Sequence, residues 1–542
     1  MAITDRIKEA VAEALNDQGL SVSPKDISLT IPPVKEHGDF STNAAMKFAK
    51  KLGKKPLELA EALASSISGE FLSRVEAVKP GFLNFFISQE DMASIVKKVL
   101  SESESFGDGE RNGIRVDLEY VSANPTGYLH LGHARGAAVG DSLARIMRKA
   151  GYSVTREYYI NDAGNQIDHM AQSLIARYLQ RLGHRDVQVP EDGYHGQDII
   201  DIACELYRDC GNEFEKDAYD HLNFFKEYGI RKLLAKIKSD LMRFGVEFDV
   251  FTSERDIRRS GKVDKVLKDL RLCTYEQDGA VFLRTIHDGD DKDRCIVKSD
   301  GSYTYFLPDI AYHQDKFDRG FDRLLDVFGA DHAGYVARLK SAMKSLGHDP
   351  DDLVVSLVQI VRLFKNGQEY RMSKRTGNAV AMNDLIDEVG VDAVRYFFVS
   401  RAGESHLDFD LDLAESLSSS NPVYYAQYTH ARLCSAIERG AQYVSDDFDA
   451  SLLTKDSEVA IMKCMRDFPE RVKEAADTYE PYKICLFVQN FASLVNDWYQ
   501  HERIVNPEDV DLTRARLALA RASRIVLRSA LTLIGVSAPE RM

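Results

Sequence analysis

The sequence predicts a multidomain α/β protein with a Rossmann-like parallel-sheet domain at its centre. A chain of 542 residues is too long for one hydrophobic core, so roughly two to four domains are expected. A strand, loop, helix and strand follow one another soon after residue 109, and strand patterns cease after residue 412. The predicted domains are a small α/β domain at 1–108, the parallel-sheet domain at 109–411 with an insertion at 168–285, and an all-α domain at 412–542.

The first domain begins with a predicted helix. Its apolar residues stand at helical spacing, with acids and bases between them: Ile3, Ile7, Val11 and Leu15. A secretory leader has an uninterrupted apolar core instead, so we expect a surface helix of a cytoplasmic protein. VEAVKPGFLNFFIS at 75–88 is strand-like, and the polar run SESESFGDGERNG at 101–113 predicts the domain boundary.

The second domain begins with a predicted βαβ unit. Its pieces are a strand in IRVDLEYVS (114–122), a helix in GHARGAAVGDSLARIMRKAGY (132–152) and a strand in SVTREYYI (153–160). This succession implies a parallel sheet. The 168–285 insertion is charged and helical in pattern. Strand-like or apolar segments then return the chain to α/β character: GSYTYFL (301–307), RLLDVFGADH (323–332) and LVVSLVQIVRLF (353–364).

Composition limits the classes of protein that fit. No segment approaches the roughly 18 apolar residues of a membrane span, so no membrane partner is expected. The seven cysteines form no CxxC pair or zinc-spaced cluster, so no protein metal site is predicted. A net charge of −15 argues against indiscriminate nucleic-acid binding. Five arginines in one helical segment form either a local basic face or a solvated helix surface: Arg514, Arg516, Arg521, Arg524 and Arg528.

The segment PTGYLHLGHARG at 125–136 stands where a predicted strand gives way to a helix. A helix N-terminus offers free N–H groups and a positive dipole end to phosphate, and Gly132 lets a ligand approach the backbone. His130 and His133 can donate hydrogen bonds to a phosphate as charge develops on it. Taken alone, the motif fits an ordinary helix N-terminus equally well.

A second candidate phosphate site lies far downstream, in RLFKNGQEYRMSKRTGN at 362–378. Its cations Arg371, Lys374 and Arg375 surround Ser373. A lone charged run is usually a solvated loop. Paired with HLGH in the same predicted domain, it predicts a cationic clamp that neutralises phosphates while pyrophosphate is displaced.

These two elements resemble the HIGH and KMSKS signatures of class I aminoacyl-tRNA synthetases, and the segments around them resemble arginyl-tRNA synthetases in particular. The similar segments leave only the 168–285 insertion poorly covered: EHGDFSTNAA, PGFLNFF, ANPTGYLHLGH, YYINDAGNQI, GADHAGY, MSKRTGN, SHLDFDLDLA, NPVYYAQYTHAR and GVSAPERM. The resemblance implies an arginine–tRNA ligase. Such an enzyme activates L-arginine with ATP to arginyl-adenylate and pyrophosphate, often only with tRNA bound, and transfers arginine to the 3′-terminal adenosine of tRNA(Arg).

The resemblance also implies roles for the phosphate-site residues. His130 and His133 would stabilise the transition state at the α-phosphate, and Gly132 would let adenine lie against the loop. Asp331 and His332 of GADH are expected near the nucleotide.

In the second signature, Ser373 and Lys374 match its end, with Lys374 the principal phosphate cation and Met372 beside ATP. Position 371 departs from the family, because Arg371 stands where lysine is usual and brings a planar guanidinium in place of a flexible point charge. Mg²⁺ is expected to arrive with ATP.

A substrate guanidinium needs carboxylates and a phenol or aromatic face around it. Glu119 lies on the strand before HLGH, and Tyr305 and Asp309 lie one helical turn apart near Pro308, a helix-start signal. These match the family's arginine-binding positions, although without the resemblance an edge-strand Glu, a helix Asp and a core Tyr are more usual. Three more residues are implied for the amino-acid pocket: Ser122, Asn124 and Gln166.

The helical C-terminus resembles the family's anticodon-binding domain, and the N-terminal domain would contact the tRNA elbow. Aromatic and polar side chains there can stack on and hydrogen-bond to unpaired bases. The candidates are Tyr424, Gln427, Tyr428, Arg432, Tyr499 and Met542. Because an aromatic stripe on a helix is more often core, we expect at least one tyrosine of NPVYYAQYTHAR to be buried.

The expected partners are thus tRNA(Arg), L-arginine and ATP, with the protein a cytoplasmic monomer, as is usual in the family. Two alternatives stay open. One is another class I synthetase, or an adenylyltransferase with the same nucleotide site. The other is a non-catalytic tRNA-binding paralogue.

Overall fold

The computed structural model describes residues 3–32, 34–370 and 380–542. The chain packs into two compact units. The first comprises 1–106, 432–467 and 493–526, and the second comprises 107–431, 468–492 and 527–542. Because helices near the C-terminus contribute to both units, compactness does not test the three predicted domain boundaries, which stay predictions.

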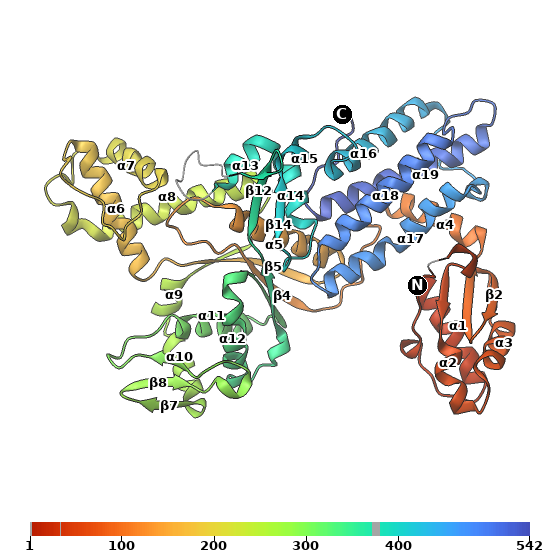
Figure 1. The fold of residues 1–542 in the computed structure, drawn as a ribbon, viewed down its shortest axis with the longest axis horizontal. Coiled ribbons are helices and arrows are strands. Elements are labelled where there is room, and N and C mark those ends of the chain that lie inside the picture. Colours follow the sequence, from red (N-terminus) through yellow and green to blue (C-terminus); the bar gives the residue numbers. More distant parts are fainter. Residues whose placement is uncertain (1–2, 33, 371–379) are drawn as a thin grey trace. The chain divides into compact units, whose positions relative to one another are not determined.

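The N-terminal part of the first unit surrounds a three-stranded antiparallel sheet in the order β1–β3–β2 (Figure 1). Its strands are β1 (Phe40–Thr42), β2 (Leu72–Val78) and β3 (Phe82–Ile87), and its helices are α1 (Ile3–Asp17), α2 (Ala44–Phe48), α3 (Pro56–Ser66) and α4 (Gln89–Glu102). The predicted opening helix is confirmed, since α1 buries Ile7, Val11 and Leu15 along one face.

The second unit contains a five-stranded sheet in the order β11–β10–β4–β5–β6, with every pair parallel. The strands are β4 (Arg115–Tyr120), β5 (Ser153–Ile160), β6 (Val250–Ser253), β10 (Arg323–Gly329) and β11 (Leu353–Val358). The chain starts in the middle at β4, runs outward to β6, and returns to β10. Strand order therefore reverses between β4 and β10, and open parallel sheets bind ligands beyond the carboxyl ends of strands at such a reversal. The predicted Rossmann-like sheet is confirmed.

Helix α5 (Leu131–Lys149) connects β4 to β5, as predicted. It lies close to the sheet because Gly140 faces Tyr120. A Cβ at Gly140 would stand 2.3 Å from Tyr120 Cγ. The small residues early in this helix thus allow the contact that holds its N-terminus beside the carboxyl end of β4.

Between β5 and β6 the chain forms α6 (Asn165–Leu182), α7 (Gln197–Cys210) and α8 (Leu222–Arg243), which share one hydrophobic core. Strand β6 belongs to the main sheet although it lies within the predicted 168–285 insertion. After it come α9 (Glu254–Arg259), α10 (Lys262–Asp269) and a small antiparallel sheet of β7 (Thr274–Gln277), β8 (Ala280–Leu283) and β9 (Arg294–Val297).

One segment differs from its predicted form, and a second divides between two sheets. GSYTYFL is not a strand: Tyr303 makes one isolated bridge to Val297, and helix α11 (Phe306–Asp318) begins at Phe306. The helix-start signals Pro308 and Asp309 outweigh the aromatic run. LVVSLVQIVRLF forms two strands in different sheets, because β11 ends at Val358 and β12 (Val361–Lys365) pairs with β13 (Gln368–Glu369) and β14 (Leu407–Asp410).

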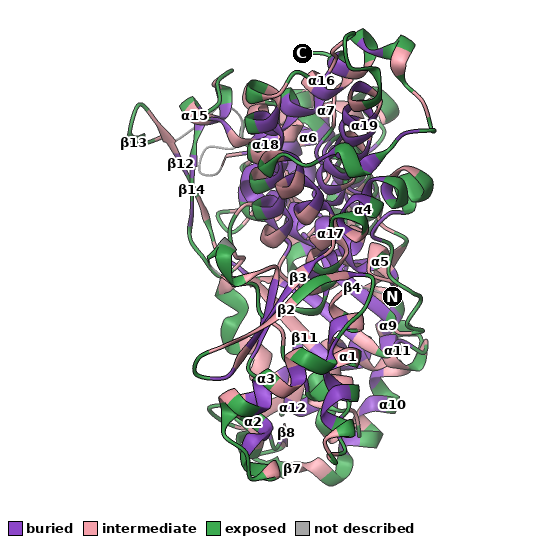
Figure 2. Cartoon of the chain, turned by 90° about the vertical axis from the view of Figure 1, so that its right-hand side faces the viewer, coloured by how far each residue is buried: buried purple, intermediate pink, exposed green. Residues whose placement is uncertain are grey.

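Helices complete the second unit and form the end of the chain. They are α12 (Ala333–Ser345), α13 (Met382–Val389), α14 (Val391–Val399), α15 (Leu411–Glu415), α16 (Pro422–Arg439), α17 (Asp456–Asp477), α18 (Tyr482–His501) and α19 (Val510–Leu533). The prediction of helices without strands after residue 412 is confirmed over a fully described stretch. Figure 2 shows buried residues along part of the surface of α17, α18 and α19 and exposed residues along the rest.

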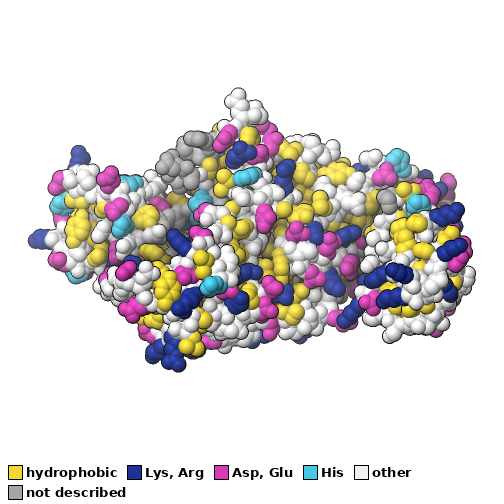
Figure 3. Space-filling view, turned by 60° about the horizontal axis from the view of Figure 1, so that its bottom comes forward, with side chains coloured by type: hydrophobic (Ala, Val, Ile, Leu, Met, Phe, Trp, Pro, Cys, Tyr) yellow, Lys and Arg dark blue, Asp and Glu magenta, His cyan; other side chains and the backbone are white. Residues whose placement is uncertain are grey.

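The arginines of α19 do not form one exposed basic face. Arg516 is buried and pairs with Glu458 at 2.8 Å and Glu502 at 2.5 Å. Figure 3 shows acidic and basic side chains interspersed over the face drawn. In the described parts of the chain, no helix combines the length and apolar character that crossing a bilayer requires.

Candidate active site

The HLGH segment forms the turn from β4 into α5, at the point of strand-order reversal. His130 is the helix N-cap, and its Nδ1 accepts a hydrogen bond from the N–H of Gly132 at 3.1 Å. Nδ1 of His133 accepts from the N–H of His130 at 3.4 Å. Because Nδ1 accepts in both rings, each neutral imidazole carries its proton on Nε2, which is the donor left for a ligand.

Partial desolvation lowers the pKa of both imidazoles and favours their neutral forms near neutral pH. Desolvation, aided by the neighbouring His130, lowers the pKa of His133 to about 3. Desolvation also lowers the pKa of His130, although Asp331 opposes that shift. The pair therefore offers hydrogen-bond donors to a phosphate rather than fixed positive charges.

The backbone is strained at Val121 and Ser122, the two residues that follow β4. Val121 has φ 70° and Ser122 has φ 37°, a left-handed conformation that costs non-glycine residues about 1 to 3 kcal/mol each. The strained turn brings Ser122 back over the strand, where its Oγ donates to Glu119 Oε1 at 2.8 Å and accepts from the N–H of Tyr159 at 3.0 Å. Strain of this kind is typical of functional sites.

The GADH segment follows β10, the strand beside β4, so it lies across the strand-order reversal from HLGH. Asp331 and His332 are exposed in a short 3-10 turn, Ala330–His332. Asp331 is close enough to raise the pKa of His130. The two segments thus follow neighbouring strands and approach each other beyond the carboxyl ends of β4 and β10.

The predicted residues Arg371, Met372, Ser373 and Lys374 lie outside the described residues. The chain is described again from residue 380. There Ala381 forms an isolated β-bridge with His130, and the N–H of Met382 donates to the carbonyl of Leu129 at 2.8 Å. The C-terminal flank of the second signature is therefore attached to the HLGH turn.

One face of α11 carries Asp309, His313 and Lys316 at intervals of four and three residues. Asp309 accepts a hydrogen bond from the hydroxyl of Tyr335 at 2.7 Å, and its Oδ1 lies 3.4 Å from His313 Nδ1. His313 Nε2 lies 2.9 Å from Asp326 Oδ2 on β10.

Lys316 extends this chain of contacts to β4. Its Nζ lies 3.1 Å from Asp326 Oδ1 and 2.7 Å from Glu119 Oε2. The two carboxylates predicted to bind arginine, Asp309 and Glu119, are thus joined through alternating charges.

The middle of this chain is fully buried. Burial by itself lowers the pKa of His313 and of Lys316, but the surrounding carboxylates raise both well above their usual values, so both side chains are cations. For Glu119 the pKa is raised overall, because Lys316 offsets only part of the rise that burial causes. The buried acids therefore depend on these two cations for their charge.

Sequence reasoning missed His313, Lys316, Asp326 and Tyr335. A signal existed for two of them, since His313 and Lys316 follow Asp309 at helical spacing on the same face. Asp326 and Tyr335 come from other elements, and no local pattern connects them to Asp309.

The other predicted pocket residues lie near this chain of contacts. Asn124 Nδ2 donates to Gln166 Oε1 at 2.7 Å, so the segment after β4 meets the start of α6. Tyr305 is 67% exposed, and its ring lies 3.7 Å from where a Cβ on Gly164 would stand. Its phenol is thus available to a ligand.

Among the described residues, Glu119, His313 and Asp326 form a group with the spacing of metal ligands. The group does not suit a metal ion, because the ammonium of Lys316 already bonds Glu119 and Asp326. The positive charge within this group comes from the Lys316 side chain rather than from a metal ion.

The predicted tRNA-binding residues differ in exposure. On α16, Tyr424 and Tyr428 stack in parallel with centroids 5.9 Å apart, and Tyr428 is exposed. Gln427 is directed inward, where its Nε2 donates to Asp392 at 2.7 Å and to the carbonyl of Ser537 at 3.0 Å. The expectation of a buried tyrosine in NPVYYAQYTHAR is wrong. Smaller or polar residues fill the inward face, leaving the tyrosines half-buried or exposed: Val423, Ala426, Thr429 and His430.

Within the first unit, two further candidates meet. The guanidinium of Arg432 lies 4.0 Å from the ring centroid of Tyr499 and donates to Asn496 Oδ1 at 3.0 Å. The terminal Met542, in the second unit, is exposed.

Models of known families match the chain in three consecutive parts. Residues 3–87 match the arginyl tRNA synthetase N terminal domain, residues 95–433 match the catalytic domain of tRNA synthetases class I (R), and residues 426–542 match the DALR anticodon binding domain. The predicted kinds of domain, in their predicted order, are confirmed.

Curated relatives match from end to end. The chain is 47% identical to the arginine–tRNA ligase of Bacillus licheniformis, over 99% of both chains. It is 48% identical to that of Geobacillus kaustophilus, over 100% of this chain and 99% of the relative. Its fold is shared with the arginyl-tRNA synthetase of Thermus thermophilus, with a TM-score of 0.79, 21% identity and 100% of both chains covered.

Proposed function

The chain belongs to the arginyl-tRNA synthetase family, as its motifs indicated, and on that premise we propose that it is an ATP-dependent arginine–tRNA ligase that charges tRNA(Arg) with L-arginine. One observation carries the proposal. Where the strand order reverses, two neutral imidazoles at a helix N-terminus follow the same strand, β4, that carries one of a set of carboxylates suited to a guanidinium. The first feature suits a triphosphate and the second suits arginine.

In the first step, a carboxylate oxygen of arginine attacks the α-phosphorus of ATP in line, and the bond to pyrophosphate breaks. The Nε2–H groups of His130 and His133 donate to the phosphate oxygens as negative charge develops there. Lys374 and Arg371 neutralise the departing pyrophosphate and Ser373 donates a hydrogen bond to it, while Met372, Gly132, Asp331 and His332 contact the nucleotide. No side-chain nucleophile is required, because positioning and charge stabilisation lower the barrier.

Recognition of arginine is assigned to both ends of the substrate. Asp309, Glu119 and Tyr305 surround the guanidinium, whose N–H donors match carboxylates and a phenol. Ser122, Asn124 and Gln166 are assigned to the α-amino end.

In the second step, the 2′-hydroxyl of the terminal adenosine of tRNA attacks the arginyl carbonyl, an ester bond forms and AMP leaves. In the second unit, the stacked pair Tyr424 and Tyr428 is assigned to stacking on unpaired anticodon bases. In the first unit, Arg432 and Tyr499 are likewise assigned to tRNA binding. Gln427 has a weaker claim to a base contact because its amide is already bonded. Met542 is retained as a candidate. We further propose that Mg²⁺ arrives with ATP and that the protein acts as a cytoplasmic monomer.

The test is ATP–pyrophosphate exchange with each of the twenty amino acids, with and without tRNA. Exchange with arginine alone supports the proposal. Exchange with another amino acid would identify a different class I synthetase. No exchange at all, together with tight retention of tRNA, would identify a non-catalytic tRNA-binding paralogue.

A further inference from the structure

The buried side chain of Lys316 contacts Glu119, one of the carboxylates proposed to bind the substrate guanidinium. Lys316 is fully buried on α11, and its Nζ lies 2.7 Å from Glu119 Oε2, 3.1 Å from Asp326 Oδ1 and 3.3 Å from Asp117 Oδ1. A fixed ammonium repels an incoming guanidinium, so its presence needs a reason. The carboxylates around it supply one.

Three carboxylates this close cannot all stay ionised away from water without a cation among them. Lys316 is that cation for Glu119. It bonds one carboxylate oxygen, while the Ser122 hydroxyl bonds the other. Together they fix the orientation of Glu119 and leave its remaining lone pairs to the pocket.

On the same helix face, His313 Nδ1 lies 2.8 Å from the backbone carbonyl of Asp309 and 3.4 Å from its carboxylate Oδ1. His313 lies between Asp309 and Asp326, and Asp326 is shared with Lys316. The sequence of charges from Asp309 to Glu119 therefore alternates in sign, and each pocket carboxylate has one cation on its buried side.

Resting on the arginine–tRNA ligase activity proposed above, we propose that Lys316 is a positioning residue for arginine recognition: it orients Glu119 and favours its ionised form, so that Glu119 accepts the substrate cation. Lys316 does not touch the substrate. It acts through Glu119, so its removal should affect arginine binding far more than ATP binding.

Charged and titratable groups face Glu119 from several elements. They are His313, Lys316 and Tyr312 on α11, Asp326 on β10, Asp117 on β4, and Glu157 and Tyr159 on β5. Burial raises the pKa of Glu119 and Lys316 lowers it. Without Lys316 the pKa of Glu119 rises further, and the ionised form that binds arginine is lost at a higher pH.

The experiment compares wild-type protein with Lys316→Met, which keeps the length of the side chain and removes its charge. KM values for arginine and for ATP are measured in aminoacylation over a range of pH, and arginine binding is measured by titration calorimetry. We expect the arginine KM to rise roughly 10- to 100-fold, as for the loss of a charged hydrogen-bond partner, with the ATP KM nearly unchanged. The acid limb of kcat/KM for arginine should move to higher pH.

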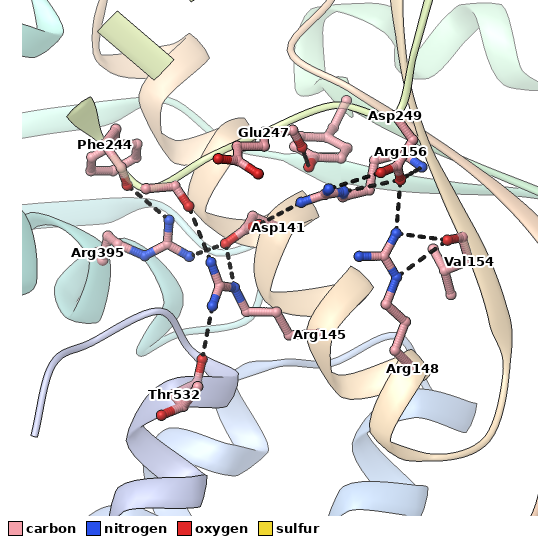
Figure 4. Close-up of polar contacts among 12 residues, drawn as sticks. Asp141, Arg145, Arg148, Val154, Arg156, Phe244, Glu247, Asp249, Arg395 and Thr532 are labelled. Atoms are coloured by element: carbon pink, nitrogen blue, oxygen red, sulfur yellow. Dashed lines mark hydrogen bonds and ion pairs between the residues drawn. The ribbon is translucent and has the colours of Figure 1, made fainter. Parts of the chain in front are cut away.

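The matched control is Arg395→Met. Arg395 is also a buried cation on a helix of the second unit, and it donates to Asp141 Oδ2 at 2.5 Å and to the carbonyl of Phe244 at 3.0 Å (Figure 4). Its loss should lower thermal stability without changing the ratio of the two KM values or the acid limb.

A second variant, Glu119→Gln, tests the mechanism if Lys316→Met fails to fold. The neutral, near-isosteric amide should raise the arginine KM and abolish the acid limb. In a double-mutant cycle, adding Lys316→Met to Glu119→Gln should cost no further arginine affinity.

Several outcomes overturn the inference. For Lys316→Met, an unchanged arginine KM would contradict the positioning role. An equal rise in the KM values for arginine and ATP would also contradict it, because a merely structural role predicts that result. For Glu119→Gln, persistence of the acid limb of kcat/KM for arginine would contradict the inference. Failure of the wild-type protein to charge tRNA with arginine would instead overturn the proposed function.

Discussion

The imidazole rings of His130 and His133 stack with centroids 3.7 Å apart, while the N–H of His130 donates to Nδ1 of His133. The pair is therefore a preformed unit in which both Nε2–H groups face away from the helix backbone. Donors fixed before the reaction stabilise a transition state without reorganisation at the moment of reaction.

Replacing His133 by alanine should lower kcat about 10²- to 10³-fold, the range seen for loss of one preorganised donor, while the KM values for ATP and arginine change little. Steady-state aminoacylation measures both. His348→Ala is the matched control, since His348 stacks on Phe317 outside the crevice and should leave kcat unchanged. An effect of His133→Ala on KM alone would contradict the transition-state role.

His133 should stay neutral across the physiological range. Its pKa is lowered to about 3, so the proton that charges the ring binds only well below pH 5. In an NMR titration of the free protein, the Cε1–H shift of His133 should stay constant as the pH falls from about 8 to about 5, where an unperturbed histidine titrates near 6.5. A midpoint near 6.5 would show that His133 becomes a cation.

Asp309→Asn should raise the KM for arginine steeply. The change removes a carboxylate charge beside the substrate guanidinium, an effect of about 2 to 5 kcal/mol for a buried charge pair. The ATP KM should stay near its wild-type value. Asp318→Asn on the same helix is the control, because Asp318 bonds Gln314 and Lys265 away from the pocket. An unchanged arginine KM in Asp309→Asn would exclude Asp309 from the pocket.

Two glycines of α5 should respond oppositely to alanine. A Cβ at Gly140 would meet Tyr120 at 2.3 Å, so Gly140→Ala should destabilise the protein by about 1 to 3 kcal/mol or more through overpacking. At Gly136 a Cβ meets nothing within 4 Å, so Gly136→Ala should stabilise the helix by up to about 1 kcal/mol. Thermal unfolding of both variants tests this contrast, and equal shifts would contradict the packing described for β4 and α5.

The local hydrophobic pattern predicted those helices and strands whose packing partners are close in the sequence. The strand at 153–160 and the helix beginning near HLGH follow from periodicity, and their order implied the parallel sheet. GSYTYFL was wrongly predicted to be strand-like. Its aromatic run favours a strand, but the run overlaps the start of a helix, and the helix is what forms. Which face of α16 is inward depends on what packs against it, so the exposure of its tyrosines was not readable from spacing.

Motifs were enough to name candidate site residues, but not to predict which side chains pack around them. HLGH, Glu119 and Asp309 could be named from sequence. The cations that contact Glu119 and Asp309 could not, because Lys316 and His313 meet their partners only when α11 packs beside β4 and β10. Likewise, the sequence placed Arg516 either on a local basic face or on a solvated helix surface, and neither holds, because Arg516 is buried against Glu458 and Glu502 in the fold.

The most direct measurement is aminoacylation of total tRNA with labelled arginine, with and without ATP. The account predicts ATP-dependent, acid-precipitable arginyl-tRNA in reactions that contain the wild-type protein. Absence of labelled product, with tRNA still bound by the protein, would mean that the motifs persist on a chain that no longer performs their chemistry.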